Sequence, residues 1–397
     1  MTENVVIASG VRTAIGDFGG ALAGIPPCEL ASQVAVEAIR RAAIEASDIE
    51  QSVFGNVIHS EPRDMYLSRV AAINAGVPET APALTLNRLC GSGLQAVVTA
   101  TEAIQLGNAE VVLAGGAESM SRSGHMINAA RFGAKMGDIT AIDMMTGALT
   151  DPFGNGHMGV TAENVAAREG IDRPTQDGIA LKSHQRAAAA IEAGYFREQI
   201  LPVTTKMGRK EAVFDTDEHV RPGISEADLV KLPAVFKRDG SVTAGNASGI
   251  NDGAAALILA LETTADARDM PKLAIIRGSA VSGVAPDVMG LGPIPAVRVA
   301  LKRAGLDVAD LSVIESNEAF AAQACAVSQN LGFPEDITNP NGGAIALGHP
   351  VGASGAIILI KLIYELRRVN GRYGLATMCI GGGQGIAVVV ENPEARS

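Results

Sequence analysis

The stretch LTLNRLCGSGLQAV, residues 84–97, places a cysteine between two different sequence patterns. The residues before Cys90 read as a strand, and those after Gly93 repeat at helical spacing up to Gly107. A helix that begins just after Cys90 directs unpaired N–H groups and partial positive charge at its sulfur. Both effects favour the thiolate over a thiol whose reference pKa is about 8.5. The sequence therefore predicts a nucleophile, with a cysteine that only packs at a strand end as the alternative.

Strand-like and helix-like segments alternate on both sides of this turn. Residues 4–9 and 51–58 read as strands, 27–44 has apolar residues at helical spacing, and 109–120 reads as a strand ending in glycines. This alternation predicts an α/β fold with a mostly parallel sheet covered by helices on both faces.

The end of the chain repeats the pattern found around Cys90. The segment NRLCGSGLQAVVTATEAIQLGNAEVVLAGGAES resembles GHPVGASGAIILIKLIYELRRVNGRYGLATMCIGGGQG, each with a glycine-rich turn, a helix and a strand that ends in glycines. The two copies lie about 260 residues apart, too far for a solenoid repeat, so we predict a duplicated α/β domain. We expect one core half at residues 1–120, completed by about 249–269, a loop domain at 121–248, and a second core half at 270–397.

Composition and charge exclude several classes of protein. The 397 residues are 47% hydrophobic and 19% charged, which predicts a large core. The net charge of −11, without a cluster of Lys and Arg, argues against a nucleic-acid partner. No uncharged apolar run reaches about 18 residues, and the first residues lack a basic start, so we expect neither a membrane partner nor a leader. The four cysteines include no CxxC pair, which predicts free thiols in the cytoplasm and no disulfide framework or metal site.

Three further residues lie where chemistry is plausible. Cys379 precedes a run of glycines that starts at Gly381 and can turn N–H groups toward an oxygen; the alternative is a buried strand cysteine. His349 lies in a turn before a helix, with Pro350 expected in the first turn, and is either an acid or base or an ordinary loop histidine. Asn317 lies where a strand gives way to a helix, and is either functional or an N-cap.

Taken together, these groups predict acyl transfer through a thioester. Two thiols, an imidazole and glycine-built anion holes in two similar halves fit covalent catalysis with stabilisation of an oxyanion. Cys28, at the head of a helix, and Cys325, among alanines inside a helix, are expected to be structural.

Seven motifs in the same order make the chain similar to the thiolase family over essentially its full length. They are NRLCGSG, GGAESMS, HMGVTAENVA, VTAGNASGINDGAAA, NEAFAAQACAV, NGGAIALGHPVGASGA and CIGGGQG. The resemblance implies a five-layered α-β-α-β-α core of two similar mixed-sheet domains, with a long loop domain that binds CoA. It also implies an acetyl-CoA C-acetyltransferase, or β-ketothiolase, which reversibly condenses two acyl-CoA molecules to a 3-ketoacyl-CoA and CoA.

The resemblance also implies roles for the candidate catalytic residues. Cys90 takes the acyl group, His349 assists formation of its thiolate, and Cys379 removes the α-proton of the second acetyl-CoA. The enolate oxygen lies near His349 and a water held by Asn317. The N–H groups of Cys90 and Gly381 face the carbonyl oxygen of the acyl-enzyme, and such donors are worth about 3–4 kcal/mol each to the barrier.

CoA contacts are implied in the same way. Ser248 is expected to contact the pantetheine and Arg221 the nucleotide. The residues expected to line the channel or touch the substrate are His157, Met158, Leu149, Met289, Ala244 and Phe320. Acetyl-CoA, acyl-CoA and 3-ketoacyl-CoA are the expected partners, and because CoA carries the substrate, no bound cofactor is expected. Gln95 and Pro222 depart from the family pattern at positions on the CoA rim.

Three other functions stay open at this point. The stretch FGNVIHSEPRDMYLSRVAAINAGV is like that of β-ketothiolases that accept longer chains, so a degradative 3-ketoacyl-CoA thiolase is the near alternative. A decarboxylating ketoacyl synthase would have a second histidine where this chain has Asn317. A non-catalytic acyl-CoA or lipid-binding protein would not need both Cys90 and Cys379. The resemblance further implies a homotetramer, a dimer of dimers.

Overall fold

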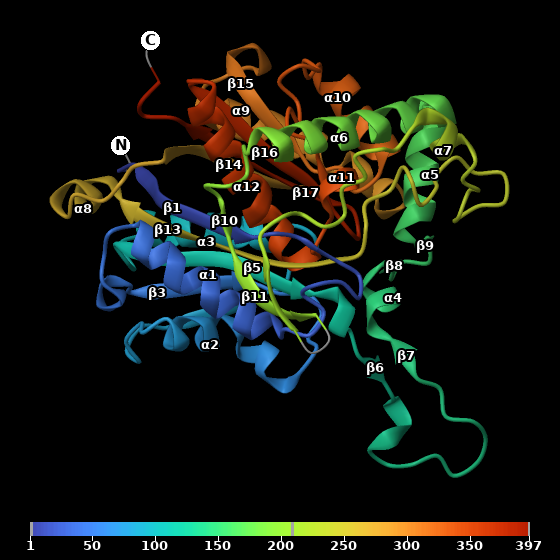
Figure 1. The fold of residues 1–397 in the computed structure, drawn as a ribbon, viewed down its shortest axis with the longest axis horizontal. Helices are drawn as coiled ribbons and strands as arrows, with labels where there is room; N and C mark the ends of the chain where they lie inside the picture. The colour runs from blue at the N-terminus through green and yellow to red at the C-terminus, as the bar shows by residue number, and fades with distance from the viewer. Residues whose placement is uncertain (1–2, 208–209, 396–397) are drawn as a thin grey trace.

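The computed structural model describes residues 3–207 and 210–395 and consists of two similar halves with a long connecting region between them (Figure 1). The first half contains β1 (Val5–Thr13), α1 (Pro27–Arg41), β3 (Gln51–Gly55), α2 (Leu67–Asn74), β4 (Ala83–Leu86), α3 (Ser92–Gln105), β5 (Val111–Ser119) and, after the connecting region, β13 (Asn251–Leu261). The second half contains β14 (Ala274–Gly283), α9 (Pro293–Ala304), β15 (Leu311–Ser316), α10 (Ala321–Leu331), α12 (Val351–Arg368), β16 (Tyr373–Ile380) and β17 (Gln384–Glu391).

The two halves have the same strand connections. In the first half the strand order is β4-β3-β5-β13-β1, and in the second it is β15-β16-β17-β14. A parallel bridge between Ile314 and Thr338 stands beside β15 where β4 stands beside β3. Each of the strands β1, β3, β5 and β13 therefore has a counterpart in β14, β15, β16 and β17, which is the duplication predicted from the sequence.

The sheets are mixed, so the expectation of a mostly parallel sheet is wrong. The pairs β3–β4, β3–β5 and β15–β16 are parallel, whereas β5–β13, β13–β1, β16–β17 and β17–β14 are antiparallel. The alternation of helices and strands predicts the parallel pairs. It does not predict that β17 follows β16 through a short turn, or that β13 returns to the first sheet after the connecting region and runs antiparallel to β5. A short ladder between β1 and β14 joins both halves into one continuous set of strands.

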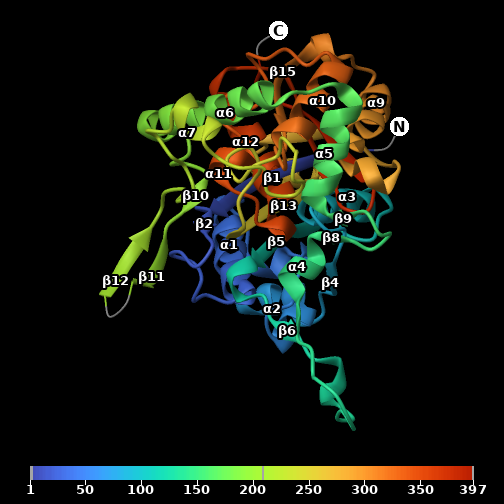
Figure 2. The same cartoon turned by 90° about the vertical axis from the view of Figure 1, so that its right-hand side faces the viewer.

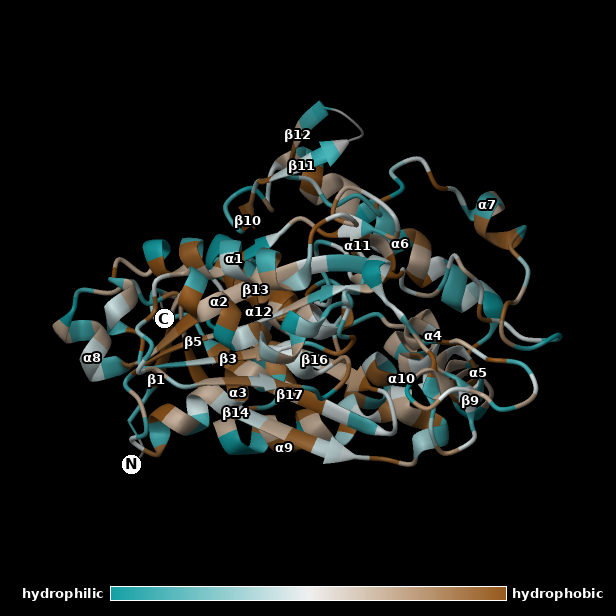
Figure 3. Cartoon of the chain, turned by 90° about the horizontal axis from the view of Figure 1, so that it is seen from below, coloured by the Kyte–Doolittle hydropathy of each residue, from teal (hydrophilic) through white to brown (hydrophobic). Residues whose placement is uncertain are grey.

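Five layers result from this arrangement. Helices α1 and α2 cover one face of the first sheet, and α9 and α10 cover the outer face of the second. The central layer holds α3 and α12, packed between the two sheets in the largest hydrophobic cluster. Glycine allows these two helices to touch, because a Cβ at Gly93 would lie 2.7 Å from the backbone nitrogen of Ala356. Hydrophobic residues accordingly gather on the strands between the helical layers (Figure 3).

The connecting region carries its own elements. It contains β6 (His125–Met126), β7 (Ile142–Asp143), α4 (Met144–Ala148), β8 (Thr150–Asp151), β9 (Gly156–His157), α5 (Met158–Glu169), α6 (Arg173–Ala193), β10 (Ile200–Leu201), β11 (Val203–Met207), β12 (Lys210–Phe214) and α7 (Glu226–Val230). Helices α5 and α6 lie against the second half, while the β6–β7 arm and the β11–β12 hairpin project from the body (Figure 2). The domain boundaries predicted above stay a prediction.

Short elements complete the chain. They are β2 (Gly16–Asp17), α8 (Glu262–Ala267), α11 (Ala344–Leu347) and the 3₁₀ turns η1 (Ala46–Asp48), η2 (Pro62–Tyr66), η3 (Met120–Arg122), η4 (Asn128–Ala130), η5 (Pro286–Leu291) and η6 (Val308–Asp310). Within the described ranges, none of the helices has the length and apolar content needed to cross a membrane.

Candidate active site

Cys90 lies in a tight turn between β4 and α3. Leu89 has a positive φ of 46°, a conformation that side chains other than glycine adopt rarely and at a cost. The amide of Leu89 donates to Asn87 Oδ1 at 2.8 Å, and Ser92 Oγ accepts from the amide of Arg88 at 2.8 Å. These contacts hold the turn, and α3 begins at Ser92, two residues after the cysteine.

Burial outweighs the backbone donors around the Cys90 sulfur. The N–H groups of Gly381 and of Cys90 itself point at the sulfur and lower its pKa. Cys90 is half-buried at the surface, but the protein atoms packed around the sulfur dominate and raise its pKa to about 11. The expectation of a net preference for the thiolate is therefore wrong, and Cys90 is a thiol at neutral pH.

His349 is a buried, neutral imidazole. Burial lowers the pKa of His349 to about 4. Its Nδ1 lies 2.6 Å from Ser354 Oγ, and its Nε2 has no hydrogen-bond partner among the residues the structure describes. Helix α12 begins at Val351, so Pro350 is the N-cap and not a first-turn residue as expected. The histidine thus keeps one ring nitrogen available.

Cys379 approaches Cys90 from the other half of the molecule. It lies on β16, just before a turn in which Gly382 and Gly383 have φ values of 80° and 89°, a conformation that favours glycine. Burial raises the pKa of Cys379, and the negative charge of an ionised Cys90 raises it further. The two segments also touch, since a Cβ at Gly91 would lie 2.6 Å from Ile380 Cδ1.

Asn317 follows β15 directly and is not the N-cap of the next helix, because α10 begins at Ala321 with Phe320 as its cap. Its amide N–H donates to Thr377 O at 2.9 Å, which fixes the residue beside β16, two positions from Cys379. Neither atom of its side-chain amide has a partner among the described residues, although the side chain is buried. Buried polar atoms without partners are uncommon and often mark functional sites.

An apolar cluster surrounds Cys379 on the side of the connecting region. Met158, Met289 and Phe320 pack with it, together with Ala162, Val242, Ala247, Ala319 and the partly buried Phe236. His157 stacks on Phe236 with ring centroids 4.7 Å apart, and burial lowers the pKa of His157. Four of the residues predicted to line the channel therefore lie in or against the apolar cluster that contains Cys379: His157, Met158, Met289 and Phe320.

The remaining predicted CoA contacts lie further out. The amide of Ser248 donates to Ala319 O at 3.0 Å, which places Ser248 beside the apolar cluster, and Ala244 is exposed on the same segment. Leu149 is half-buried, and its carbonyl accepts from the amide of Met158 at 2.8 Å. Arg221 is exposed next to His184 of α6, and no contact joins it to the cluster in the described chain.

Sequence reasoning missed Glu118. This fully buried carboxylate at the end of β5 accepts from the amides of Val57, Ile58 and Gly352 and from the side chain of Asn56, at 2.9–3.2 Å. Burial raises the pKa of Glu118 to about 8, while all of its contacts are donors that suit a carboxylate. Glu118 thus ties the first turn of α12, which follows His349, to the half that carries Cys90.

Asn251 was missed as well. Its Oδ1 accepts from the amide of His349 at 2.9 Å, and its Nδ2 donates to Gly16 O at 3.0 Å. These contacts fix the backbone of the histidine. Asn251 lies in the motif VTAGNASGINDGAAA, which was noted in the sequence. Its partner His349 lies 98 positions away, so the sequence pattern alone could not show that the two residues are in contact.

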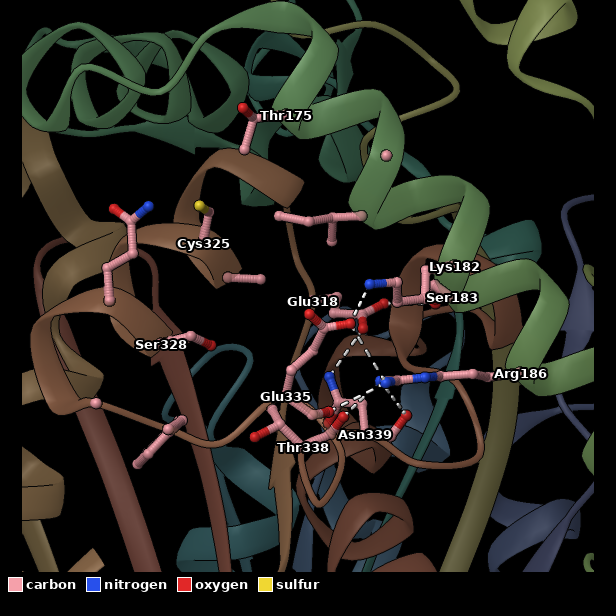
Figure 4. A pocket seen from close by; sticks show the side chains of 16 residues that line it. Thr175, Lys182, Ser183, Arg186, Glu318, Cys325, Ser328, Glu335, Thr338 and Asn339 are labelled. Atoms are coloured by element: carbon pink, nitrogen blue, oxygen red, sulfur yellow. Dashed lines mark hydrogen bonds and ion pairs between the residues drawn. The ribbon is translucent and has the colours of Figure 1, made fainter.

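A large cavity of the described chain lies elsewhere. It has a volume of about 750 Å³ and opens between α6 and α10, with Lys182, Ser183, Glu318, Cys325 and Glu335 among its lining residues (Figure 4). Lys182 pairs with Glu335, and Glu318 accepts from Ser183 at 2.6 Å and from Asn339 at 2.8 Å. Burial raises the pKa of Cys325. The cavity holds none of the candidate catalytic residues.

The other predicted features concern cysteines and metals. All four cysteines are free, and Cys28 donates to Asp64 Oδ1 at 3.3 Å while burial raises its pKa to about 12. Among the described residues, no group of three or more His, Cys, Asp or Glu could hold a metal ion.

Comparison with known proteins identifies the family. The thiolase N-terminal domain model matches residues 5–263, and the thiolase C-terminal domain model matches residues 270–392. The chain belongs to the thiolase family. It is 57% identical over 392 residues to beta-ketothiolase BktB of Cupriavidus necator, covering 98% of this chain and 100% of that protein.

Solved structures of thiolases have the same fold. The human mitochondrial 3-ketoacyl-CoA thiolase in complex with CoA superimposes with a TM-score of 0.96 at 43% identity and 98% coverage of both chains. The Bacillus anthracis acetyl-CoA acetyltransferase does so with a TM-score of 0.96 at 44% identity, over 98% of this chain and 99% of that one. The predicted family, fold class and acyltransferase class of this thiolase are confirmed.

Proposed function

We propose that this thiolase is an acetyl-CoA C-acetyltransferase of the β-ketothiolase type, which reversibly condenses two acyl-CoA molecules to a 3-ketoacyl-CoA and CoA. One observation carries the proposal: the segments that hold Cys90 and Cys379 come from different halves and touch, since the N–H of Gly381 points at the Cys90 sulfur and a Cβ at Gly91 would lie 2.6 Å from Ile380 Cδ1. His349 Nε2 and the side-chain amide of Asn317 are also buried and have no partner in the described chain. The names of its relatives, beta-ketothiolase and acetyl-CoA acetyltransferase, agree with this activity.

The first half-reaction, acetylation of Cys90, begins with Cys90 and His349 both uncharged. Because Cys90 is a thiol and His349 a neutral imidazole, His349 acts as a general base and takes the thiol proton as the sulfur attacks the thioester carbon. The N–H groups of Cys90 and Gly381 converge beside the sulfur and stabilise the developing oxyanion. When the intermediate collapses, the CoA thiolate leaves with the proton from His349, and an acetyl group remains on Cys90.

The second half-reaction uses Cys379. Transfer of its proton to His349 Nε2 gives a thiolate and an imidazolium. Since burial raises the pKa of Cys379, this thiolate is a stronger base than an exposed cysteine and suits removal of the α-proton of a second acetyl-CoA. The enolate oxygen is stabilised by His349 and the amide of Asn317. The enolate carbon then attacks the acetyl group, and the Cys90 thiolate that is released takes the proton from His349.

CoA acts as the carrier of the substrate in this proposal, and no resident cofactor takes part. Ser248 and Ala244 would contact the pantetheine and Arg221 the nucleotide, while Met158, Met289, His157, Leu149 and Phe320 would enclose the thioester. The apolar cluster around Cys379 supports a dry acyl site. Four free cysteines agree with a reducing, cytoplasmic location.

We also infer a homotetramer. The β6–β7 arm exposes Phe132 (92%) and Met136 (95%), together with Met126, Ile127, Ile139 and Ile142. A contiguous set of exposed apolar side chains on a projecting arm is typical of an interface between proteins. Sedimentation of the intact chain tests this, and a monomer at micromolar concentration would contradict it.

Intact-mass measurement after mixing with acetyl-CoA tests the activity. We expect one acetyl group on the wild-type chain, none on Cys90→Ala, and a stable acetyl group without acetoacetyl-CoA production on Cys379→Ala. An acetylated Cys90→Ala chain would contradict the assignment of the nucleophile. Thiolysis rates on acetoacetyl-CoA and on a long 3-ketoacyl-CoA then separate the proposed enzyme from a degradative long-chain thiolase.

A further inference from the structure

His349 needs a defined tautomer for the proposed mechanism, on which this inference rests. A neutral imidazole carries its proton on one ring nitrogen only, and the other nitrogen is then the base. Because His349 is neutral at pH 7, it can accept a proton from a thiol at Nε2 only if its own proton is on Nδ1. Whatever contacts Nδ1 therefore decides whether Nε2 is a base.

Ser354 is the group that contacts Nδ1. It lies on the first turn of α12, is buried, and its Oγ is 2.6 Å from His349 Nδ1. The same Oγ is 2.9 Å from the carbonyl oxygen of Pro350 and donates its hydrogen to it, the i to i−4 contact that serines make within helices. With its own hydrogen directed at Pro350, the hydroxyl presents lone pairs to Nδ1.

We propose that Ser354 is a positioning residue that holds His349 in the tautomer protonated at Nδ1, so that Nε2 keeps a lone pair for the thiols of Cys90 and Cys379. The hydrogen-bond chain runs from His349 Nδ1–H to Ser354 Oγ and from Ser354 O–H to Pro350 O. These two hydrogen bonds stay in place when His349 becomes an imidazolium, because Nδ1–H still donates to Ser354 Oγ. No donor and acceptor therefore have to exchange roles during the reaction. Such preorganisation avoids a reorganisation cost at the transition state.

Contacts around His349 also restrict the position of its backbone. Asn251 fixes the amide of His349, and the preceding Gly348 has a φ of 106° in which a Cβ would collide with Asn251. Ser354 also lines a small cavity of about 10 Å³ together with Asn317 and Lys361, so its side chain is not compressed. The backbone contacts therefore fix the position of His349, and Ser354 determines which ring nitrogen carries the proton.

Nitrogen NMR on the wild-type chain tests the tautomer directly. The sequence has six histidines, so ¹⁵N-histidine labelling gives few signals, and comparison with His349→Asn assigns the relevant ring. At pH 7 we expect a proton on Nδ1 of His349 and an unprotonated Nε2. A proton on Nε2 in the wild-type protein would overturn the proposal, whatever the variants do.

Partial reactions of serine variants provide the second test. In Ser354→Ala, Nδ1 loses its acceptor, and we expect the rate of Cys90 acetylation to fall roughly tenfold to hundredfold, the range for loss of a hydrogen bond to a group that becomes charged. KM for acetyl-CoA should change little, because Ser354 does not touch the substrate. Ser354→Thr keeps the hydroxyl and should recover most of the rate.

Ser32→Ala is the matched control. Ser32 makes the same i to i−4 contact in α1, donating to Cys28 O at 2.7 Å, away from both thiols of the site. We expect this variant to acetylate like wild type. Acetylation of Ser354→Ala at the wild-type rate would overturn the inference alone, whereas failure of the wild-type chain to acetylate at Cys90 would overturn the proposed function and leave the NMR test standing.

Discussion

The protonation state of the resting enzyme can be tested through the reactivity of Cys90. A cysteine–histidine pair can rest either as a thiolate and an imidazolium or as two neutral groups, and the alkylation rate of the thiol separates them because only the thiolate reacts. Here burial raises the pKa of Cys90 to about 11 and lowers that of His349 to about 4. The neutral pair is therefore the resting state at every pH between these values.

The size of the effect follows from the thiolate fraction. With a pKa of about 11, roughly one Cys90 in a thousand is a thiolate at pH 8 and one in a hundred at pH 9. We therefore expect the alkylation rate by iodoacetamide, in the absence of acyl-CoA, to rise about tenfold per pH unit from pH 6.5 to 9.5 without a plateau. An unperturbed cysteine would begin to level off near pH 8.5.

Peptide mass mapping at Cys90 supplies the assay, since it separates Cys90 from the other three cysteines. His349→Asn is the control, and it should leave the slope unchanged because a neutral imidazole contributes no charge to stabilise the thiolate. A flat rate between pH 6 and 8 that His349→Asn converts into a rising one would show an ion pair. That result would refute both the pH argument and the general-base role given to His349.

Three other substitutions test how the site and the surrounding fold are held. Glu118→Gln places an amide N–H against backbone donors, so we expect a loss of about 1–3 kcal/mol in the free energy of unfolding by urea and slower acetylation of Cys90 with little change in KM. Arg12→Met leaves the buried Asp217 without its bidentate partner at 2.7 and 2.9 Å, which should cost about 3–5 kcal/mol, and adding Asp217→Leu should recover most of it. Gly348→Ala forces a side chain into a φ of 106° and against Asn251, and it should abolish acetylation while the chain remains folded by circular dichroism.

Motifs predicted the family, the duplication and the catalytic candidates, because turn residues and their order along the chain are local features. Cys90, His349 and Cys379 each stand in a glycine-bounded turn that the sequence reveals without a structure. The resemblance also implied the N–H groups of Cys90 and Gly381 as an oxyanion hole, and both of them point at the Cys90 sulfur. The sequence could not predict the sign of the pKa shift, because burial of the sulfur depends on residues packed around it from distant parts of the chain.

The residues that support the site could not be predicted from the sequence for a related reason. Glu118 acts through Gly352, which is 234 positions away, and Asn251 acts through His349 across 98 positions. Strand direction was mispredicted for a topological reason, since β13 returns to its sheet only after the long connecting region. Ser354 is the exception: five residues after His349 at the start of a predicted helix, it could have been paired with the histidine from spacing alone.

The duplication also gives the chain two equivalent constellations, whose contacts differ. Asn56 follows β3 as Asn317 follows β15, and Glu118 is the second-to-last residue of β5 as Cys379 is of β16. In the first half, Asn56 donates to Glu118, whose remaining contacts hold the first turn of α12. In the second half, Asn317 has no side-chain partner in the described chain.

Cys90 and His349 are equivalent in the same sense, since each stands two residues before its central helix, α3 or α12. In the first half, Asn56 and Glu118 make the contacts that join the two halves. These contacts fix the position of α12, the helix that follows His349. In the proposed mechanism, the asparagine and thiol of the second half act on the substrate. If this division holds, exchanging Asn56 for Asp should weaken the junction with Glu118 by placing two carboxyl groups together, and lower stability. Exchanging Asn317 for Asp should leave stability nearly unchanged and remove condensation, because the proposed mechanism uses only the second amide.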